Sequence, residues 1–189
     1  LITDAADEGL AEAMERLVAM YRNGIGVKRD LNKAAEWKEK YIAELEKEYR
    51  IQPKKSELNN LFWEVMDCVS LYNTTGKLET AYDKTVYAFK LMKEYSSIQN
   101  EKFVLFNTAD CYEKIGDNFR KRGQPTKSKE YYIKSLELRR KIALNDNSPK
   151  IRYNLSSCYY KLGLLCRTLC DNVAAKEYFL MHREIICDI

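Results

Sequence analysis

"NTADCYEKIG", residues 107–116, returns as "NLSSCYYKLG" at residues 154–163. The two stretches share Asn, Cys, Tyr, Lys and Gly, and they lie 47 residues apart. The same offset separates three further sets of residues: Asn60, Asn107 and Asn154; Gly76, Gly123 and Cys170; Ala81, Ser128 and Ala175. A fixed period held over three copies predicts a repeat protein.

Each 47-residue unit divides into two helical stretches. Within residues 57–76, apolar side chains recur in steps of three and four, which is the pattern of one helix face. "YNTTGK" then interrupts the pattern, and residues 78–95 resume it. The later units predict helices near 101–122, 126–144, 149–169 and 172–187. Two such helices cannot bury their apolar faces alone, so we expect an all-α solenoid of stacked helical hairpins with one concave wall.

The composition agrees with an all-helical chain. Only seven Gly and three Pro punctuate 189 residues, too few for many strands joined by turns. The 32 basic and 28 acidic residues are interleaved as on salt-bridged helix faces, and no basic block predicts a nucleic-acid partner. No apolar run approaches the ~20 residues of a membrane span, and no signal peptide is visible. Because the chain opens in mid-pattern without Met, we expect it to be part of a longer polypeptide.

The cysteines favour a reducing compartment. All six are separate, with no C-x-x-C pair, and most lie among apolar helical neighbours. Cys158, Cys166 and Cys170, with His182, could be read as metal ligands, but a site needs three or four converging side chains. We therefore predict buried structural thiols, a cytoplasmic protein, and neither metal nor cofactor.

The spacing of small residues identifies a family resemblance. Gly116 and Ser128 are twelve apart, as are Gly163 and Ala175, and Tyr132 and Phe179 supply the second-helix aromatic. This pattern resembles the tetratricopeptide repeat, whose usual length is 34 residues. The resemblance implies three such repeats with longer helices in residues 55–189, at about 56–97, 101–144 and 149–189. The first of these is more divergent, since Val69 stands where a small residue is expected.

Residues 1–50 resemble a related family. "DEGLAEAMERLVAMYRNGIGVKRDLNKAAEWKEK" is similar to a Sel1-like repeat, in which Gly24 and Gly26 would provide the turn between two short helices. "GIG" could also be a phosphate loop, but it has neither the third Gly of a dinucleotide fingerprint nor a following G-K-[ST]. Leu1, Ile2 and Leu10 predict that this end needs a neighbouring repeat, and that it otherwise exposes an apolar patch or covers that patch with a second copy.

The resemblance implies a non-catalytic scaffold or adaptor that binds an extended segment of another protein on its concave wall. An alternative is a peptide-sensing domain, as in bacterial regulators, that controls an effector outside this sequence. An enzyme is disfavoured: the carboxylates Asp110, Glu113 and Asp117 share a helix face, but no nucleophile or His accompanies them. A solvated charged face is the simpler interpretation of these three residues.

The family register predicts which side chains line the wall. Trp63 and Tyr160 are either groove anchors or packing residues, and the sequence leaves both interpretations open. The expected partner-binding residues are Asn60, Trp63, Met66, Asn107, Asp110, Glu113, Asp117, Arg120, Asn154, Tyr160, Leu164 and Arg167.

Asn60, Asn107 and Asn154 occupy one position in each repeat. They could form a ladder of amides that grips a peptide backbone. The alternative is that each Asn bonds locally, joining repeats or capping a helix.

Overall fold

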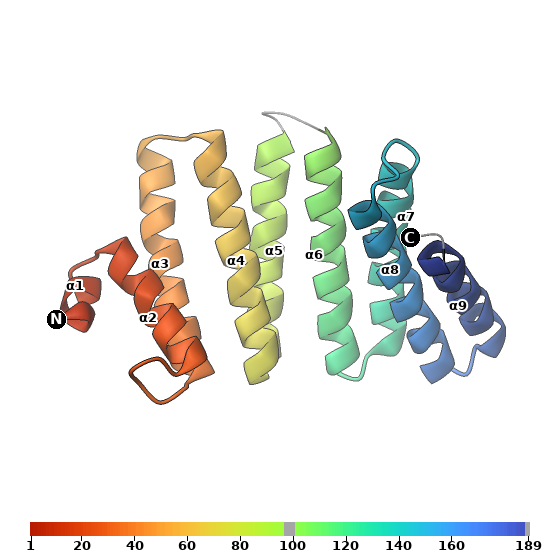
Figure 1. Ribbon diagram of the computed structural model, residues 1–189, viewed down its shortest axis with the longest axis horizontal. Coiled ribbons are helices and arrows are strands. Elements are labelled where there is room, and N and C mark those ends of the chain that lie inside the picture. Colours follow the sequence, from red (N-terminus) through yellow and green to blue (C-terminus); the bar gives the residue numbers. More distant parts are fainter. Residues whose placement is uncertain (97–100, 188–189) are drawn as a thin grey trace. The chain divides into compact units, whose positions relative to one another are not determined.

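The computed structural model describes residues 1–96 and 101–187, and the described residues form nine helices and no strand (Figure 1). Two compact units can be distinguished: unit 1 spans Leu1–Ile98, and unit 2 spans Gln99–Ile189. Unit 1 contains α1 (Ile2–Asp7), α2 (Ala11–Asn23), α3 (Leu31–Ile51), α4 (Lys55–Thr75) and α5 (Leu78–Ser96). Unit 2 contains α6 (Glu101–Lys121), α7 (Pro125–Ala143), α8 (Pro149–Thr168) and α9 (Asn172–Cys187).

Within each unit, every helix packs on the next one along the chain. The pairs α2/α3, α4/α5, α6/α7 and α8/α9 are antiparallel hairpins (Figure 1). The all-α hairpin architecture expected from the 47-residue period is therefore confirmed.

Three hairpins close with the same turn. Gly76, Gly123 and Cys170 have φ values of 79°, 70° and 60°. In each turn the next residue donates its backbone N–H to the carbonyl oxygen five residues back, which belongs to Tyr72, Phe119 or Cys166. This left-handed ending satisfies carbonyl groups that the helix leaves without a partner. The same backbone turn therefore recurs every 47 residues, which is the offset seen in the sequence.

The α2–α3 hairpin uses a different connection. Gly24 and Gly26 have φ values of 73° and 72°, and Asp30 caps α3 by accepting hydrogen bonds from the backbone of Asn32 and Lys33. Leu1 and Leu10 are exposed in unit 1. Association through this end, like the Sel1-like assignment and the repeat boundaries, stays a prediction.

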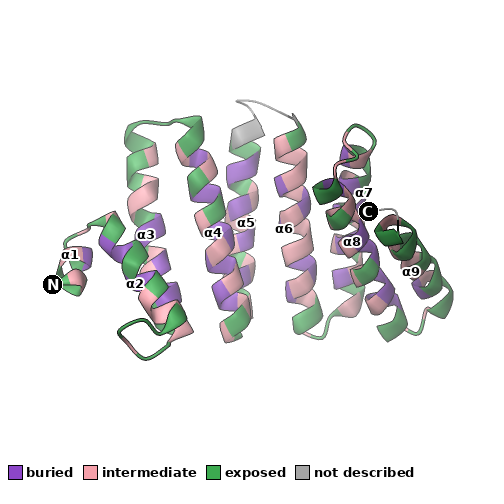
Figure 2. Cartoon of the chain, viewed as in Figure 1, coloured by how far each residue is buried: buried purple, intermediate pink, exposed green. Residues whose placement is uncertain are grey.

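Small residues lie where the two helices of a hairpin meet. Ala81, Ser128 and Ala175 are all buried, as their register predicted, and Ser128 Oγ donates to the Gly116 carbonyl oxygen at 2.8 Å. α9 is otherwise largely exposed, with Ala175 its buried residue (Figure 2).

Two glycines allow an aromatic ring to approach the first helix closely. A Cβ atom at Gly116 would lie 2.5 Å from Cδ1 of Tyr132, and one at Gly163 would lie 2.7 Å from Cε1 of Phe179. At the same register in unit 1, Val69 and Thr85 replace the glycine and the ring, and both are buried. The divergent repeat therefore exchanges volume between two positions that share one space, as close packing requires.

This exchange predicts coupled mutations. Gly116→Val should lower the free energy of unfolding by roughly 1–3 kcal/mol, because the new methyl groups meet the Tyr132 ring. Adding Tyr132→Thr recreates the Val69–Thr85 pair, so the double variant should lose less than the sum of the two single losses. Urea unfolding of the four proteins measures the coupling. Strictly additive losses would show that the two side chains do not share this space.

Cys170 offers a second test. A side chain at positive φ costs about 1–2 kcal/mol, and glycine removes that cost while adding freedom to the unfolded chain. Cys170→Gly should therefore raise the free energy of unfolding by roughly 0.5–1 kcal/mol. Leu169→Gly is the control, since Leu169 has φ −86° and should lose stability. A destabilised Cys170→Gly protein would mean that the thiol makes a contact that outweighs the backbone strain.

Candidate functional site

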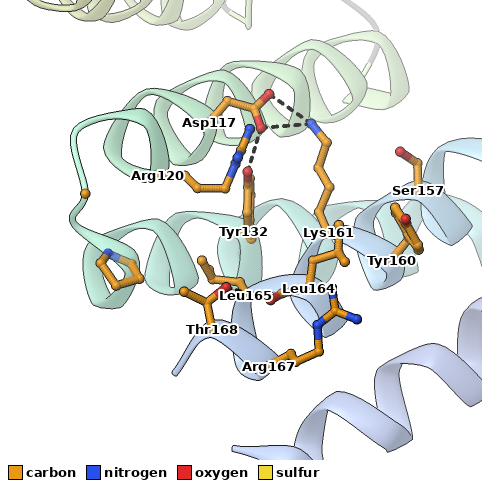
Figure 3. Close-up of a pocket in the computed structure, with 12 residues that line it drawn as sticks. Asp117, Arg120, Tyr132, Ser157, Tyr160, Lys161, Leu164, Leu165, Arg167 and Thr168 are labelled. Atoms are coloured by element: carbon orange, nitrogen blue, oxygen red, sulfur yellow. Dashed lines mark hydrogen bonds and ion pairs between the residues drawn. The ribbon is translucent and has the colours of Figure 1, made fainter. Parts of the chain in front are cut away.

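Unit 2 carries an open groove of about 680 Å3 between α6, α7 and α8 (Figure 3). Charged side chains at its rim are Asp117, Arg120, Lys161 and Arg167. The other lining residues are Gly123, Pro125, Tyr132, Ser157, Tyr160, Leu164, Leu165 and Thr168. The groove therefore has three cationic side chains and one carboxylate around an apolar floor.

Arg139 of α7 is the centre of a buried ion cluster beside this groove. Its Nη2 atom donates to Asp110 Oδ1 at 2.7 Å and to Glu113 Oε2 at 2.5 Å, and the Arg139 side chain is 5% exposed. Its Nε donates to Ser135 Oγ at 3.3 Å, and Ser135 Oγ in turn donates to the Ala109 carbonyl. Arg139 thus fixes two acidic residues of α6 from the neighbouring helix.

Lys161 extends the cluster from α6 to α8. Its Nζ atom lies 2.7 Å from Glu113 Oε1 and 2.9 Å from Asp117 Oδ2. Asp117 also accepts a hydrogen bond from Tyr132 Oη at 2.5 Å, as Figure 3 shows. The carboxylates of Asp110, Glu113 and Asp117 are consequently all held by partners within the protein.

Burial and charge act in opposite directions on the pKa values of this cluster. Burial raises the pKa of Asp110 above its usual 3.8, even though Arg139 opposes that rise. Burial would also raise the pKa of Glu113, but the charges of Arg139 and Lys161 outweigh it and hold that pKa below 4.5. For Lys161, burial would lower the pKa, but Glu113 and Asp117 raise it above 10.5. Lys161 therefore stays charged at the groove.

Unit 1 contains a related cluster around Lys38 of α3, a side chain that is 6% exposed. Lys38 Nζ pairs with Glu64 and lies 3.0 Å from Asp67 Oδ2, which Arg22 Nη2 also contacts at 2.6 Å. Burial would lower the pKa of Lys38, but the two carboxylates raise it. A buried cation on a second helix thus fixes acidic residues of a first helix in both units.

The predicted wall residues of unit 2 separate into two groups. Asp117, Arg120, Tyr160, Leu164 and Arg167 line the groove, and Arg120, Tyr160 and Arg167 are exposed. Asp110 and Glu113 belong to the ion cluster instead. The expectation of a freely solvated acidic face is therefore wrong, because Arg139 and Lys161 hold these carboxylates.

The predicted amide ladder is also wrong at its centre. Asn107 is fully buried, and neither of its side-chain amide atoms has a hydrogen-bond partner among the described residues. Asn154 is half-buried, whereas Asn60 is exposed and hydrogen-bonds with Tyr41. Three residues in one register thus have three environments, and a peptide cannot reach Asn107.

In unit 1, Trp63 is 43% exposed, but Met66 is buried and cannot contact a partner. The interpretation of Trp63 as an anchor stays a prediction.

Sequence reasoning did not find Arg139, Lys161 or Tyr132 as site residues. Arg139 could have been noticed, because it stands where Met92 and Ile186 stand in the other repeats. A charged residue at an apolar register position needs a buried partner. For Lys161 no such signal exists, since Lys114 occupies the same register in the preceding repeat.

A reactive thiol, a metal site and a membrane-spanning helix each have requirements that can be compared with the described residues. Cys68, Cys111, Cys158 and Cys166 are buried free thiols, and burial raises the pKa of Cys158 to about 11. In residues 1–96 and 101–187, no group of three or more His, Cys, Asp or Glu could hold a metal ion. Over the same described ranges, no helix combines the length and apolar character needed to span a bilayer.

Comparisons with known proteins identify the fold. No protein-family model matches the chain, and no curated protein matches its sequence. The structure is similar to that of BtubC (BKLC) from P. vanneervenii, with a TM-score of 0.71 and 15% identity over 95% of this chain and 64% of BtubC. It is also similar to a putative kinesin light chain from Podosopora anserina with nearly identical TPR-like repeats. That TM-score is 0.66, with 13% identity over 99% of this chain and 82% of the other.

The fold is therefore that of TPR-like helical repeats. The chain spans 64% of the length of BtubC, which is less than two thirds.

The opposite pKa shifts of Asp110 and Glu113 predict opposite effects on stability. The pKa of Glu113 is lowered by folding, so its stabilisation is present above pH 4.5 and is lost as the pH falls below that value. The pKa of Asp110 is raised by folding, so its ionisation opposes folding as the pH rises above 3.8. At pH 7, Glu113→Gln should lower the free energy of unfolding by roughly 3–5 kcal/mol, and Asp110→Asn should lower it much less or raise it.

Urea unfolding between pH 3 and pH 7 measures both effects. The loss of unfolding free energy caused by Glu113→Gln should become smaller toward low pH. Equal losses for the two variants at pH 7 would contradict the assignment of Glu113 as the principal partner of Arg139 and Lys161.

Proposed function

We propose that this chain is a non-catalytic protein-interaction module, and that the groove of unit 2 binds a segment of another protein. The observation that carries the proposal is the groove lining itself. Apolar side chains lie beside exposed cations, in a volume of about 680 Å3. This volume falls within the ~300–1,000 Å3 of typical ligand pockets, which suits a short segment of a few residues.

The charge of the groove selects the partner. Asp117, the carboxylate of the lining, already binds Lys161 and Tyr132. Arg120 and Arg167 are exposed at the groove. A guanidinium group binds carboxylates through two parallel hydrogen bonds, so an acidic side chain of the partner is the complementary group.

The apolar part of the groove selects apolar side chains in the partner segment. Tyr160 is 45% exposed, and Leu164 lies one turn further along α8. Residues of an extended segment point alternately to opposite sides. A segment that alternates apolar and acidic residues could therefore place apolar side chains against Tyr160 and Leu164 of α8 and acidic side chains toward Arg120 of α6.

The arrangement of polar groups argues against catalysis. A nucleophile must be within reach of both a base and a substrate. Ser156 Oγ lies 2.7 Å from His182 Nδ1, but Ser156 is fully buried, so a substrate cannot reach this hydroxyl. The acidic residues that could act as acid and base are already bound to Arg139 and Lys161.

The buried thiols support a location in a reducing compartment. Six free cysteines, four of them buried, suit the cytoplasm, where disulfides are rare. We propose this location together with the function.

Reversing the charge of the groove tests the proposal. Fluorescence anisotropy should show that labelled Ac-GLELEG-NH2 binds more tightly than Ac-GLKLKG-NH2, and that added salt weakens this binding. Arg120→Glu and Arg167→Glu should each weaken it by roughly tenfold or more, the worth of one charged hydrogen bond.

Arg183→Glu is the matched control, because Arg183 is an exposed arginine of α9 outside the groove lining. It changes the net charge equally and should leave the affinity unchanged. Equal effects of all three variants, or preference for the lysine peptide, would overturn the proposed acidic partner.

A further inference from the structure

The single histidine of the chain connects α9 to the groove helix α8. His182 Nδ1 lies 2.7 Å from Ser156 Oγ and 3.2 Å from the Ser156 carbonyl oxygen. Both contacts are made by one ring nitrogen with one residue of α8. The orientation of the imidazole is therefore fixed by the groove helix.

The two contacts favour one tautomer. A carbonyl oxygen can only accept a hydrogen bond, so the 3.2 Å contact is a hydrogen bond when Nδ1 carries the hydrogen, whereas the 2.7 Å contact with the hydroxyl suits either tautomer. Nδ1–H can donate to the carbonyl and to the hydroxyl oxygen together. If Nδ1 carried no hydrogen, it would face the carbonyl lone pairs without a bond between them.

The ring of His182 supports a groove residue. Its centroid lies 5.2 Å from that of Tyr160, and the Phe179 ring lies 5.9 Å from Tyr160 on the same helix α9. Pairs at these separations stabilise each other beyond the area they bury. In the described part of the chain, Tyr160 makes ring contacts with Phe179 and His182, and no hydrogen bond of its hydroxyl is seen.

The preceding repeat shares part of this arrangement. Ser135 has the register of His182, and Ser135 Oγ donates to the carbonyl of Ala109, which has the register of Ser156. Glu113 has the register of Tyr160 and is held by Arg139. In both hairpins the second helix therefore contacts a carbonyl of the first helix and a side chain at the register of Tyr160, although Arg139 has the register of Ile186 and not that of His182.

We infer that His182 is a positioning residue for the binding groove, which holds the Tyr160 ring in the orientation that receives an apolar side chain of the partner. This inference rests on the proposed function. Preorganising an exposed side chain reduces the entropy that binding must overcome. His182 would thus set the affinity of the groove without contacting the ligand.

The ring and the hydrogen bond can be separated by substitution. His182→Phe keeps an aromatic ring against Tyr160, whereas His182→Asn keeps an N–H donor near the Nδ1 position but has no ring. His182→Ala has neither. Thermal melts of all three identify any variant that does not fold, and the Phe and Asn variants carry the test if His182→Ala fails to fold.

The first measurement needs no ligand. The chain is labelled with 3-fluorotyrosine, and the Tyr160 resonance is assigned by its loss in Tyr160→Phe. In the Ala and Asn variants, this resonance should move toward that of free fluorotyrosine and sharpen, whereas in the Phe variant it should stay near its original position. Tyr153, which is 62% exposed on α8, serves as the internal control and should not move in any variant. An unchanged Tyr160 resonance in the Ala and Asn variants would overturn the inference.

The second measurement is the affinity for Ac-GLELEG-NH2. His182→Ala and His182→Asn should weaken binding by roughly threefold to tenfold, the worth of one aromatic pair, and His182→Phe should retain it. If Tyr160 loosens but the affinity stays unchanged, positioning does not control binding and the inference fails. If the peptide binds no form of the chain, the proposed partner fails, and the fluorine measurement still decides whether His182 positions Tyr160.

Discussion

The approach of the Tyr132 ring to Gly116 links the fold of unit 2 to its groove. Because Gly116 has no Cβ atom, the ring lies against the backbone of α6, where a methyl group would be 2.5 Å from Cδ1. The same approach places the Tyr132 hydroxyl 2.5 Å from Asp117 Oδ1. Asp117 then binds Lys161 of α8. One packing constraint therefore joins three helices and orients a carboxylate at the groove.

Two cations, buried Arg139 and half-buried Lys161, determine which charges the groove leaves exposed. Counted from the sequence, α6 presents an acidic face through Asp110, Glu113 and Asp117. Arg139 and Lys161 pair with these three carboxylates, and among the charged residues of the groove lining Arg120 and Arg167 are exposed. Since an ion pair within the protein is already desolvated, a partner gains little by competing for these carboxylates. The lining of the groove therefore has more cationic than acidic side chains, although the α6 face is acidic in the sequence.

The fold could be predicted from the sequence, whereas the site could be predicted only in part. Backbone geometry repeats with the sequence: Gly76, Gly123 and Cys170 share a left-handed turn, and the predicted helices of unit 2 lie within one or two residues of the observed ones. Side-chain environments do not repeat in this way. Asn60, Asn107 and Asn154 share a register, yet one is exposed, one is half-buried and one is fully buried. Burial depends on neighbours in adjacent helices, which a periodic pattern does not specify.

This difference explains how a repeat can vary its chemistry without changing its shape. The turn, the small residue and the space shared by Gly116 and Tyr132 are steric requirements, and the Val69–Thr85 pair meets the last of them with different residues. The register of Tyr160 has no such requirement. Glu113 and Tyr160 occupy one register, the first held by an arginine and the second by a histidine. The side chain presented at this register therefore depends on two residues: the first-helix residue itself, and the second-helix residue that holds it.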